Sequence, residues 1–185
     1  MPRTLLNGTL IILALIGACV AGRLIPHWPN AAPVLSAALF AGFILRSRWA
    51  ALAVPVVAML VTDLIWFGTY TTGEMAVNYL ALSLPILLGP ALRGDKRTAW
   101  RVGGLSLGAA LLFFAVSNFG VWLFGSMYGR SVAGLIECYV LALPFLKYTI
   151  AGAVAWSAVF FGSYELATRG APAIGRTVRR LAPVS

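Results

Sequence analysis

The chain alternates long apolar runs with short polar connectors, and most of the runs are long enough to cross a membrane as helices. Crossing about 30 Å of hydrocarbon takes roughly 20 residues at about 1.5 Å of rise each. The runs are continuously apolar, whereas the strands of a membrane barrel would alternate. An all-α bundle of six transmembrane helices is therefore predicted, with spans at residues 5–20, 31–45, 49–71, 75–92, 102–124 and between 144 and 166.

Two apolar stretches have more than one interpretation. Residues 132–143, "VAGLIECYVLAL", are either an interfacial or re-entrant helix before the last span, or the beginning of that span. Residues 1–20 loosely resemble an export signal, with "LIGAC" as a lipoprotein cleavage box and Cys19 as the modified residue. A cleaved signal would leave five spans, which fits the charge distribution less well, so we expect retention of this run as the first span.

The composition excludes a soluble domain. Of the 185 residues, 61% are hydrophobic and only 10% are charged, and the mean hydropathy is +0.90. Soluble domains carry about 25% charged residues. The expected organisation is one transmembrane domain over residues 1–168, followed by a basic cytoplasmic tail over residues 169–185.

The net charge of +9 follows the pattern of membrane topology rather than that of nucleic-acid binding. With the N-terminus inside, eleven of the fourteen basic residues lie in cytoplasmic segments, at positions 3, 46, 48, 93, 96, 97, 101, 169, 176, 179 and 180. Cytoplasmic connectors are enriched in Lys and Arg, so both termini are predicted inside. Anionic lipid at that face is the expected partner of the basic tail, and no nucleic acid is expected.

Polar residues at membrane depth gather in the outer half of the predicted bundle. The candidate substrate-binding residues are His27, Asp63, Asn78, Tyr79, Asn118, Trp122, Tyr128, Arg130 and Tyr139. An ionisable group inside a membrane costs several kcal/mol unless it is paired or hydrated. The asymmetry therefore predicts an outward-facing pocket, a pathway or a structural ion pair at that end.

Each candidate also has a structural interpretation. Asp63 either faces a ligand or pairs with Arg130 or Lys147 to close the bundle, and Glu137 is expected to pair with Lys147. Asn118 is also suited to a hydrogen bond between helices. An interfacial aromatic belt would account for Trp28, Trp66, Trp122 and Tyr128.

Small residues four apart mark surfaces where helix backbones approach closely. They occur as Ala14-Ala18-Gly22, Ala37-Ala41 and Gly104-Gly108, and suit either internal packing or docking of a partner membrane protein. No catalytic motif accompanies them: the chain has one histidine and neither H-E-x-x-H nor G-x-S-x-G. We therefore expect no enzymatic activity and no intrinsic cofactor.

Four segments together resemble a known kind of membrane protein. They are "RLIPHWPN" at 23–30, "APVLSAALFAG" at 32–42, "VPVVAMLVTD" at 54–63 and "SNFGVWLFGSMYGRSVAGLIECYVLALPFLKY" at 117–148. They resemble small six-span bacterial proteins similar to the substrate-binding S components of energy-coupling-factor (ECF) vitamin transporters. Within that set the resemblance is closest to the BtuM-type cobalamin transporters.

The resemblance implies uptake of a vitamin, with cobalamin as the leading substrate, through a periplasm-facing pocket in the bacterial inner membrane. It implies roles in ligand binding for His27, Asp63 and Tyr79, and an ECF energising module as a possible partner. The BtuM type binds cobalt through a cysteine, but no cysteine occurs between residues 62 and 92 here. His27 then becomes the candidate cobalt ligand, and Cys138 the less favoured one.

Two functions remain open from the sequence. The first is a transport protein that binds a vitamin-like substrate. The alternative is a structural or regulatory membrane subunit, whose polar outer cluster is an ion-pair network with no small-molecule substrate.

Overall fold

The predicted all-helical fold is confirmed by a computed structural model that describes residues 3–26, 28–66, 72–94 and 98–181. Its α-helices are α1 (Arg3–Leu24), α2 (Val34–Ile44), α3 (Arg48–Trp66), α4 (Thr72–Ser83), α5 (Ala99–Phe124) and α6 (Val132–Leu181). Two 3-10 helices, η1 (Leu84–Leu87) and η2 (Gly89–Leu92), extend α4. No strand occurs in these described ranges.

Four helical segments are long and apolar enough to cross a membrane: Arg48–Ile65, Thr72–Leu92, Ala99–Phe124 and Val132–Thr168. The other two predicted spans correspond to shorter apolar helices, Gly8–Leu24 and Val34–Ile44. At about 1.5 Å per residue, the 11 residues of α2 extend only about 16 Å. The chain thus has the helices of a multi-pass membrane protein, and α2 is too short to cross a bilayer by itself.

The stretch 132–143 is the beginning of α6, because the helix runs without interruption from Val132 to Leu181. Proline usually bends or ends a helix, yet Pro144 lies inside α6 just as Pro55 lies inside α3. Pro85 and Pro90 instead occupy the first turns of η1 and η2, where a missing N–H leaves no helical bond unmade. Helix α6 also continues through most of the predicted tail.

Helix α2 forms the centre of the core, and every side chain from position 34 to 43 is buried. Ser36 donates a hydrogen bond to the carbonyl of Ala153 at 2.8 Å, which joins α2 to α6. Just before α2, the carbonyl of Ala31 accepts a hydrogen bond from the Trp156 indole at 2.9 Å. A short apolar helix surrounded by longer ones is the arrangement expected of a buried core element.

Glycine allows the backbones of α2 and the 3-10 helices to touch. A Cβ on Gly42 would lie 2.1 Å from the carbonyl oxygen of Ile86, and one on Gly89 would lie 2.3 Å from the backbone of Gly42. The predicted Gly104–Gly108 surface behaves differently, since a Cβ at either position would meet nothing within 4 Å. That small-residue surface is therefore not used for packing within the described chain.

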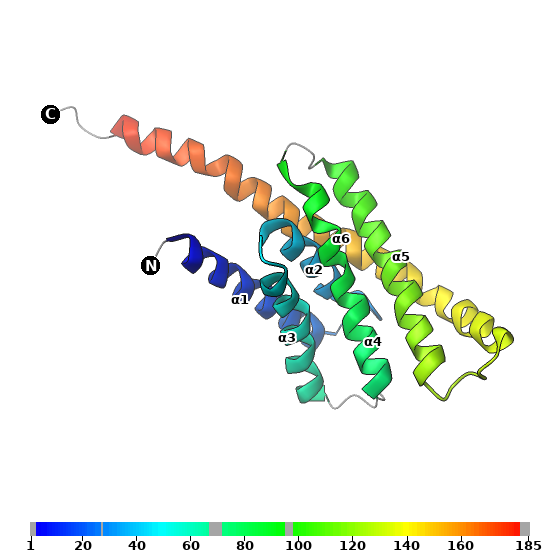
Figure 1. Cartoon of the computed structure of the whole chain (residues 1–185). Helices are drawn as coiled ribbons and strands as arrows, with labels where there is room; N and C mark the ends of the chain where they lie inside the picture. The colour runs from blue at the N-terminus through cyan, green and yellow to red at the C-terminus, as the bar shows by residue number, and fades with distance from the viewer. Residues whose placement is uncertain (1–2, 27, 67–71, 95–97, 182–185) are drawn as a thin grey trace.

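Figure 1 shows the start of α1 and the far end of α6 on the same side of the bundle. We call this side the terminal end. The last turn of α3, the first turn of α4 and the connection between α5 and α6 lie at the opposite end. The predicted polar cluster belongs to that opposite end, whereas Arg46 and Arg93, in connections, and Arg48, at the start of α3, lie at the terminal end.

Candidate functional site

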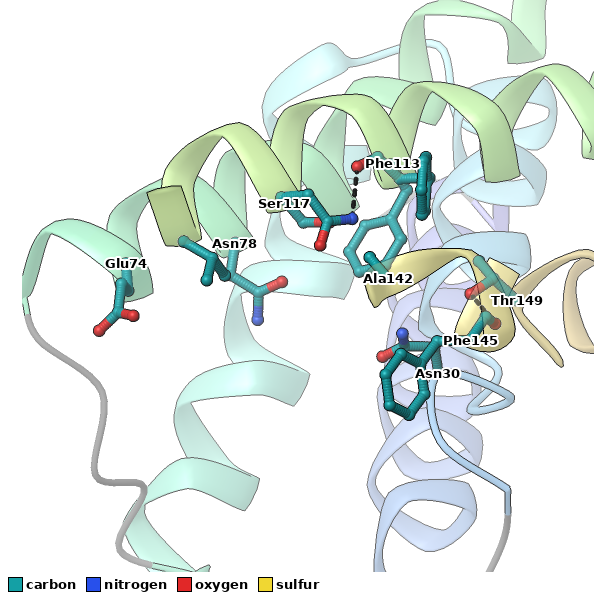
Figure 2. Close-up of a pocket in the computed structure, with 11 residues that line it drawn as sticks. Asn30, Glu74, Asn78, Phe113, Ser117, Ala142, Phe145 and Thr149 are labelled. Atoms are coloured by element: carbon teal, nitrogen blue, oxygen red, sulfur yellow. Dashed lines mark hydrogen bonds between the residues drawn. The ribbon is translucent and has the colours of Figure 1, made fainter. Parts of the chain in front are cut away.

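Two adjoining cavities open between α4, α5, α6 and the segment that precedes α2 (Figure 2). The larger has a volume of about 180 Å³ and the smaller about 100 Å³. Both are lined by Asn30, Asn78, Phe113 and Thr149, so they are parts of one recess. We call it the asparagine pocket, because Asn30, Asn78 and Asn118 line it.

Each of the three helices contributes one face to the asparagine pocket. From α4 come Glu74 and Asn78, one turn apart; α5 contributes Phe113, Phe114, Ser117, Asn118 and Val121; α6 contributes Ala142, Phe145 and Thr149. Side chains spaced three or four residues apart lie on the same side of a helix. The pocket walls are therefore continuous helical stripes, two of which mix aromatic and polar side chains.

The pocket contains hydrogen-bonding groups that the described chain does not satisfy. The side-chain amides of Asn30 and Asn78 and the hydroxyl of Ser117 have no hydrogen-bond partner among the described residues. Asn118 uses one N–H, which donates to the carbonyl of Phe114 at 2.8 Å, and this bond is drawn in Figure 2. A carboxamide both donates and accepts hydrogen bonds, so the pocket offers a ligand several unused donors and several unused acceptors.

Asn30 is held in an unusual backbone conformation. Its φ is 60°, and it is the only non-glycine residue with positive φ in the described ranges. Asn tolerates this left-handed region better than most residues, and the turn around it is closed by a hydrogen bond from the N–H of Ala31 to the carbonyl of Trp28. Strained residues of this kind concentrate at binding sites, and in Figure 2 Asn30 lies beside Phe145 and Thr149.

An ion pair borders the smaller cavity. Arg23 of α1 donates to Asp63 of α3 at 2.8 Å, and the Tyr79 hydroxyl of α4 donates to the other carboxylate oxygen, also at 2.8 Å. Arg23 also reaches the sulfur of Met59 at 2.9 Å. Its Nε is buried without a hydrogen-bond partner in the described chain, and Arg23 lines the smaller cavity. The cluster joins three helices and leaves one donor at the pocket wall.

A family model matches residues 4–174 of the chain, described as a family of unknown function (DUF6580). The chain belongs to DUF6580. No match to it was found among curated proteins or among solved structures. The site of this DUF6580 chain is therefore interpreted from its own geometry.

In this DUF6580 chain, Asp63 and Tyr79 come together as the resemblance implies, but they bond to each other and to Arg23. Asp63 does not pair with Arg130 or Lys147, the two partners weighed from the sequence. Arg130 lies in the α5–α6 connection and Lys147 lies in α6, whereas Arg23 lies in the last turn of α1, next to Asp63 of α3. Neither Asp63 nor Tyr79 lines the asparagine pocket.

Three of the candidates in the DUF6580 chain stabilise the connection between α5 and α6. The Trp122 indole donates to the carbonyl of Gly129 at 3.0 Å. Arg130 donates to the carbonyls of Trp122 and Gly125 at 2.6 and 2.9 Å. Tyr128 is half-buried in the same connection, and partial burial, with the charges of Cys138 and Glu137 acting in the same direction, raises the pKa of its phenol. These side chains shape the connection and do not line the pocket.

The remaining candidates fasten α5 to α6 or lie outside the described ranges. Tyr139 donates to the carbonyl of Ala115, and the buried Cys138 thiol contacts the carbonyl oxygen of Asn118 at 3.4 Å. His27 falls outside the described residues. The expected ion pair between Glu137 and Lys147 is not formed: both side chains are exposed, and the Lys147 ammonium lies 4.8 Å from the Tyr148 ring centre.

Sequence reasoning missed most of the α5 and α6 walls. Ser117, Phe145 and Thr149 line the pocket. Taken one at a time, they are residues of a kind that is common in transmembrane helices, so none of them indicates a site. The signal that was present is periodicity, since Glu74 and Asn78 on α4, and Phe114 and Asn118 on α5, are each four residues apart. A polar stripe on one span and a mixed aromatic and polar stripe on the neighbouring span, both at helical spacing, predict a shared recess.

The chemistry of the pocket suits a small organic molecule. Three carboxamides and a hydroxyl offer directional hydrogen bonds, Phe113, Phe114 and Phe145 offer aromatic surface, and Glu74 adds a carboxylate. Within the described residues, no three His, Cys, Asp or Glu side chains are grouped to hold a metal ion. The arrangement therefore favours a ring-containing ligand with hydrogen-bonding groups.

Proposed function

We propose that this protein is a six-helix, S-component-like transport protein of a bacterial inner membrane, which binds a vitamin-like molecule in the asparagine pocket from the periplasmic side. The observation that supports the proposal best is the set of unpartnered carboxamides, Asn30 and Asn78, in a recess of an otherwise apolar bundle. Asn30 is exposed and Asn78 is half-buried, so both amides are accessible to a ligand in the recess. Each hydrogen bond from such a ligand to an amide would contribute about 0.5–1.5 kcal/mol to binding.

The volume of the pocket limits the size of the substrate. Pockets for drug-sized ligands commonly have volumes of about 300–1,000 Å³, and the larger cavity here has about 180 Å³. We therefore favour a vitamin-like compound of one or two small rings. Cobalamin, which the sequence resemblance suggests, would require the pocket to widen considerably, with His27 supplying the nitrogen ligand to cobalt.

The topology of the proposal follows from charge. The terminal end carries the basic connections, and Lys and Arg are enriched on the cytoplasmic side of membrane proteins. The pocket at the opposite end would then face the periplasm. An ECF energising module is the proposed partner for release of the substrate to the cytoplasm, and the unpacked Gly104–Gly108 surface of α5 is free for a contact of that kind.

The Arg23–Asp63–Tyr79 cluster favours a second function for part of the polar end. Its groups bond to one another across three helices, as expected of a structural or regulatory subunit with no small-molecule substrate. In the transport proposal, the cluster instead supports the pocket, and the ligand contacts come from the asparagines.

The replacement of Asn78 by leucine is expected to weaken ligand binding at least tenfold, because it removes a hydrogen-bonding group of the pocket and a tenfold change corresponds to about 1.4 kcal/mol. Purified protein would be titrated by calorimetry with a panel of thiamine, riboflavin, biotin, nicotinamide and cobalamin. Tyr79→Phe is the matched control, since Tyr79 follows Asn78 on α4 but bonds to Asp63. Its affinity should stay within about twofold of the wild type.

The panel separates the possible functions. Binding of a small-ring vitamin that Asn78→Leu weakens and Tyr79→Phe does not would support the proposal. Cobalamin binding lost on His27→Ala would support the larger substrate. If no compound of the panel bound, and cells that depend on uptake gained no growth from this protein, the structural function would be favoured.

A further inference from the structure

A second pair of cavities lies at the terminal end, on the far side of the bundle from the asparagine pocket. One of them, of about 280 Å³, is lined by Arg46, Arg48 and Arg93 together with Gly42 and Pro90. Among the described residues that line it, none carries a carboxylate. Three guanidinium groups around one concave surface make a site for an anion.

The arginine cavity is built on a close contact between backbones. Its floor is the close approach of α2 to η1 and η2 at Gly42. Arg93 is fixed there by three hydrogen bonds of 2.7–2.9 Å, to the carbonyls of Gly42, Phe43 and Leu45. These bonds use its Nε and Nη2, so that the two N–H groups of Nη1 remain for a ligand.

The other two arginines have no such restraint. Arg46 and Arg48 are exposed, and neither has a hydrogen bond or ion pair among the described residues. A guanidinium binds phosphate with two parallel hydrogen bonds. One fixed and two adaptable guanidinium groups around the cavity can thus close on a phosphate group from several sides.

An apolar groove continues from the arginine cavity along the outside of the bundle. It has a volume of about 320 Å³, shares Arg48, Ile86 and Leu87 with the arginine cavity, and runs between α3 and α4. Its other walls include Trp49, Leu52 and Leu80. Among its described lining residues the one hydroxyl, that of Ser83, donates to the carbonyl of Tyr79, so this hydroxyl has no donor left for a ligand.

We propose that these two adjoining cavities bind one anionic phospholipid, with its phosphate among Arg46, Arg48 and Arg93 and an acyl chain in the groove beside Trp49 and Leu80. A free phosphate would use the arginines but not the groove, and a neutral lipid would use the groove but not the arginines. Basic pockets between membrane helices on the cytoplasmic side are known to hold such head groups. The site is independent of the function proposed for the asparagine pocket.

The chain offers a matched pair of control residues for this site. Arg48 and Trp49 open α3, and Trp100 and Arg101 open α5, both pairs in exposed positions. Trp49 is 82% exposed and Trp100 is 92% exposed, but only Arg48 and Trp49 line the cavities. None of the four side chains is buried, so their replacement should leave the fold intact.

The test is lipid retention. Full-length protein would be released from nanodiscs of dioleoyl phosphatidylglycerol and dioleoyl phosphatidylcholine, and bound lipid counted by native mass spectrometry. We expect one phosphatidylglycerol retained per chain, at least a fivefold loss of retention in Arg48→Gln, and less than a twofold loss in Arg101→Gln. Trp49→Gln should reduce the preference for long-chain over dihexanoyl phosphatidylglycerol, and Trp100→Gln should not.

Four results would overturn the proposal. The first is equal retention of phosphatidylcholine, and the second is an equal loss in Arg48→Gln and Arg101→Gln. The third is thermal stabilisation by inorganic phosphate as large as that by phosphatidylglycerol, which would indicate a free anion. Recovery of the protein with an acidic polypeptide in place of the lipid would be the fourth.

Discussion

Replacement of Asp63 by asparagine is expected to lower the free energy of unfolding by about 3 kcal/mol, one of the two largest effects of a single substitution in this chain. The change keeps the size of the side chain but leaves the Arg23 guanidinium, 27% exposed, without its counter-charge. Removing one member of a buried ion pair costs about 3–5 kcal/mol, and the partial exposure of this pair places the effect at the lower limit. Unfolding in mixed micelles of SDS and a mild detergent would measure it.

Two further variants define the cause of this loss. Arg23→Gln combined with Asp63→Asn restores a neutral, hydrogen-bonded pair and should recover more than half of the lost stability. Glu137→Gln, which makes the same chemical change at an exposed acid of α6, should have an effect below about 0.5 kcal/mol. Equal stability of Asp63→Asn and the wild type would show that the ion pair contributes nothing to the fold.

Replacement of Gly42 by alanine is expected to destabilise the protein by about 3 kcal/mol. The added methyl group would lie 2.1 Å from the carbonyl oxygen of Ile86 and 2.8 Å from its Cα. Both are backbone atoms, so no rotation of a side chain can relieve the overlap. Overpacking of a tight core costs about 1–3 kcal/mol, and a backbone obstacle places this change at the upper limit. The same unfolding assay applies.

Gly17→Ala is the matched control for this glycine. Gly17 lies within α1, and a Cβ there would meet nothing within 4 Å. Alanine is favoured over glycine inside a helix by about 0.5–1 kcal/mol, so this variant should be as stable as the wild type or more stable. A similar loss in both variants would indicate that helix propensity, and not the close contact with Ile86, determines the result.

The helical bundle could be predicted from the sequence because long apolar runs allow few other structures in a membrane. The lengths of the helices could not be predicted equally well. The apolar run at 31–45 is a core helix of 11 residues, and hydropathy alone does not distinguish a buried helix from a spanning one. A proline usually interrupts a helix, but α6 continues past Pro144, because one lost hydrogen bond is small against the packing of a helix of 50 residues.

The polar end could be located from the sequence, but its division into two sites could not. Asp63, Asn78 and Tyr79 were all assigned to ligand binding from their depth in the spans, and Asp63 and Tyr79 also from the resemblance. Asn78 and Tyr79 are adjacent in the chain, and adjacent residues of a helix point in directions about 100° apart. Asn78 therefore faces the pocket, and Tyr79 faces α3 and Asp63. Only the packing of the neighbouring helices determines which direction leads to a cavity.

The continuity of α6 has a mechanical consequence. At about 1.5 Å per residue its 50 residues extend about 75 Å, more than twice the thickness of the hydrocarbon core. The same rod carries Phe145 and Thr149 at the pocket and extends past the terminal end of the bundle (Figure 1). A force on its protruding end would tilt α6 about Gly152 and Ala153. There α6 packs closely against Ala31, and the carbonyl of Ala153 accepts the hydrogen bond from Ser36. A pull on the protruding end would then move the pocket wall without any break in the helix.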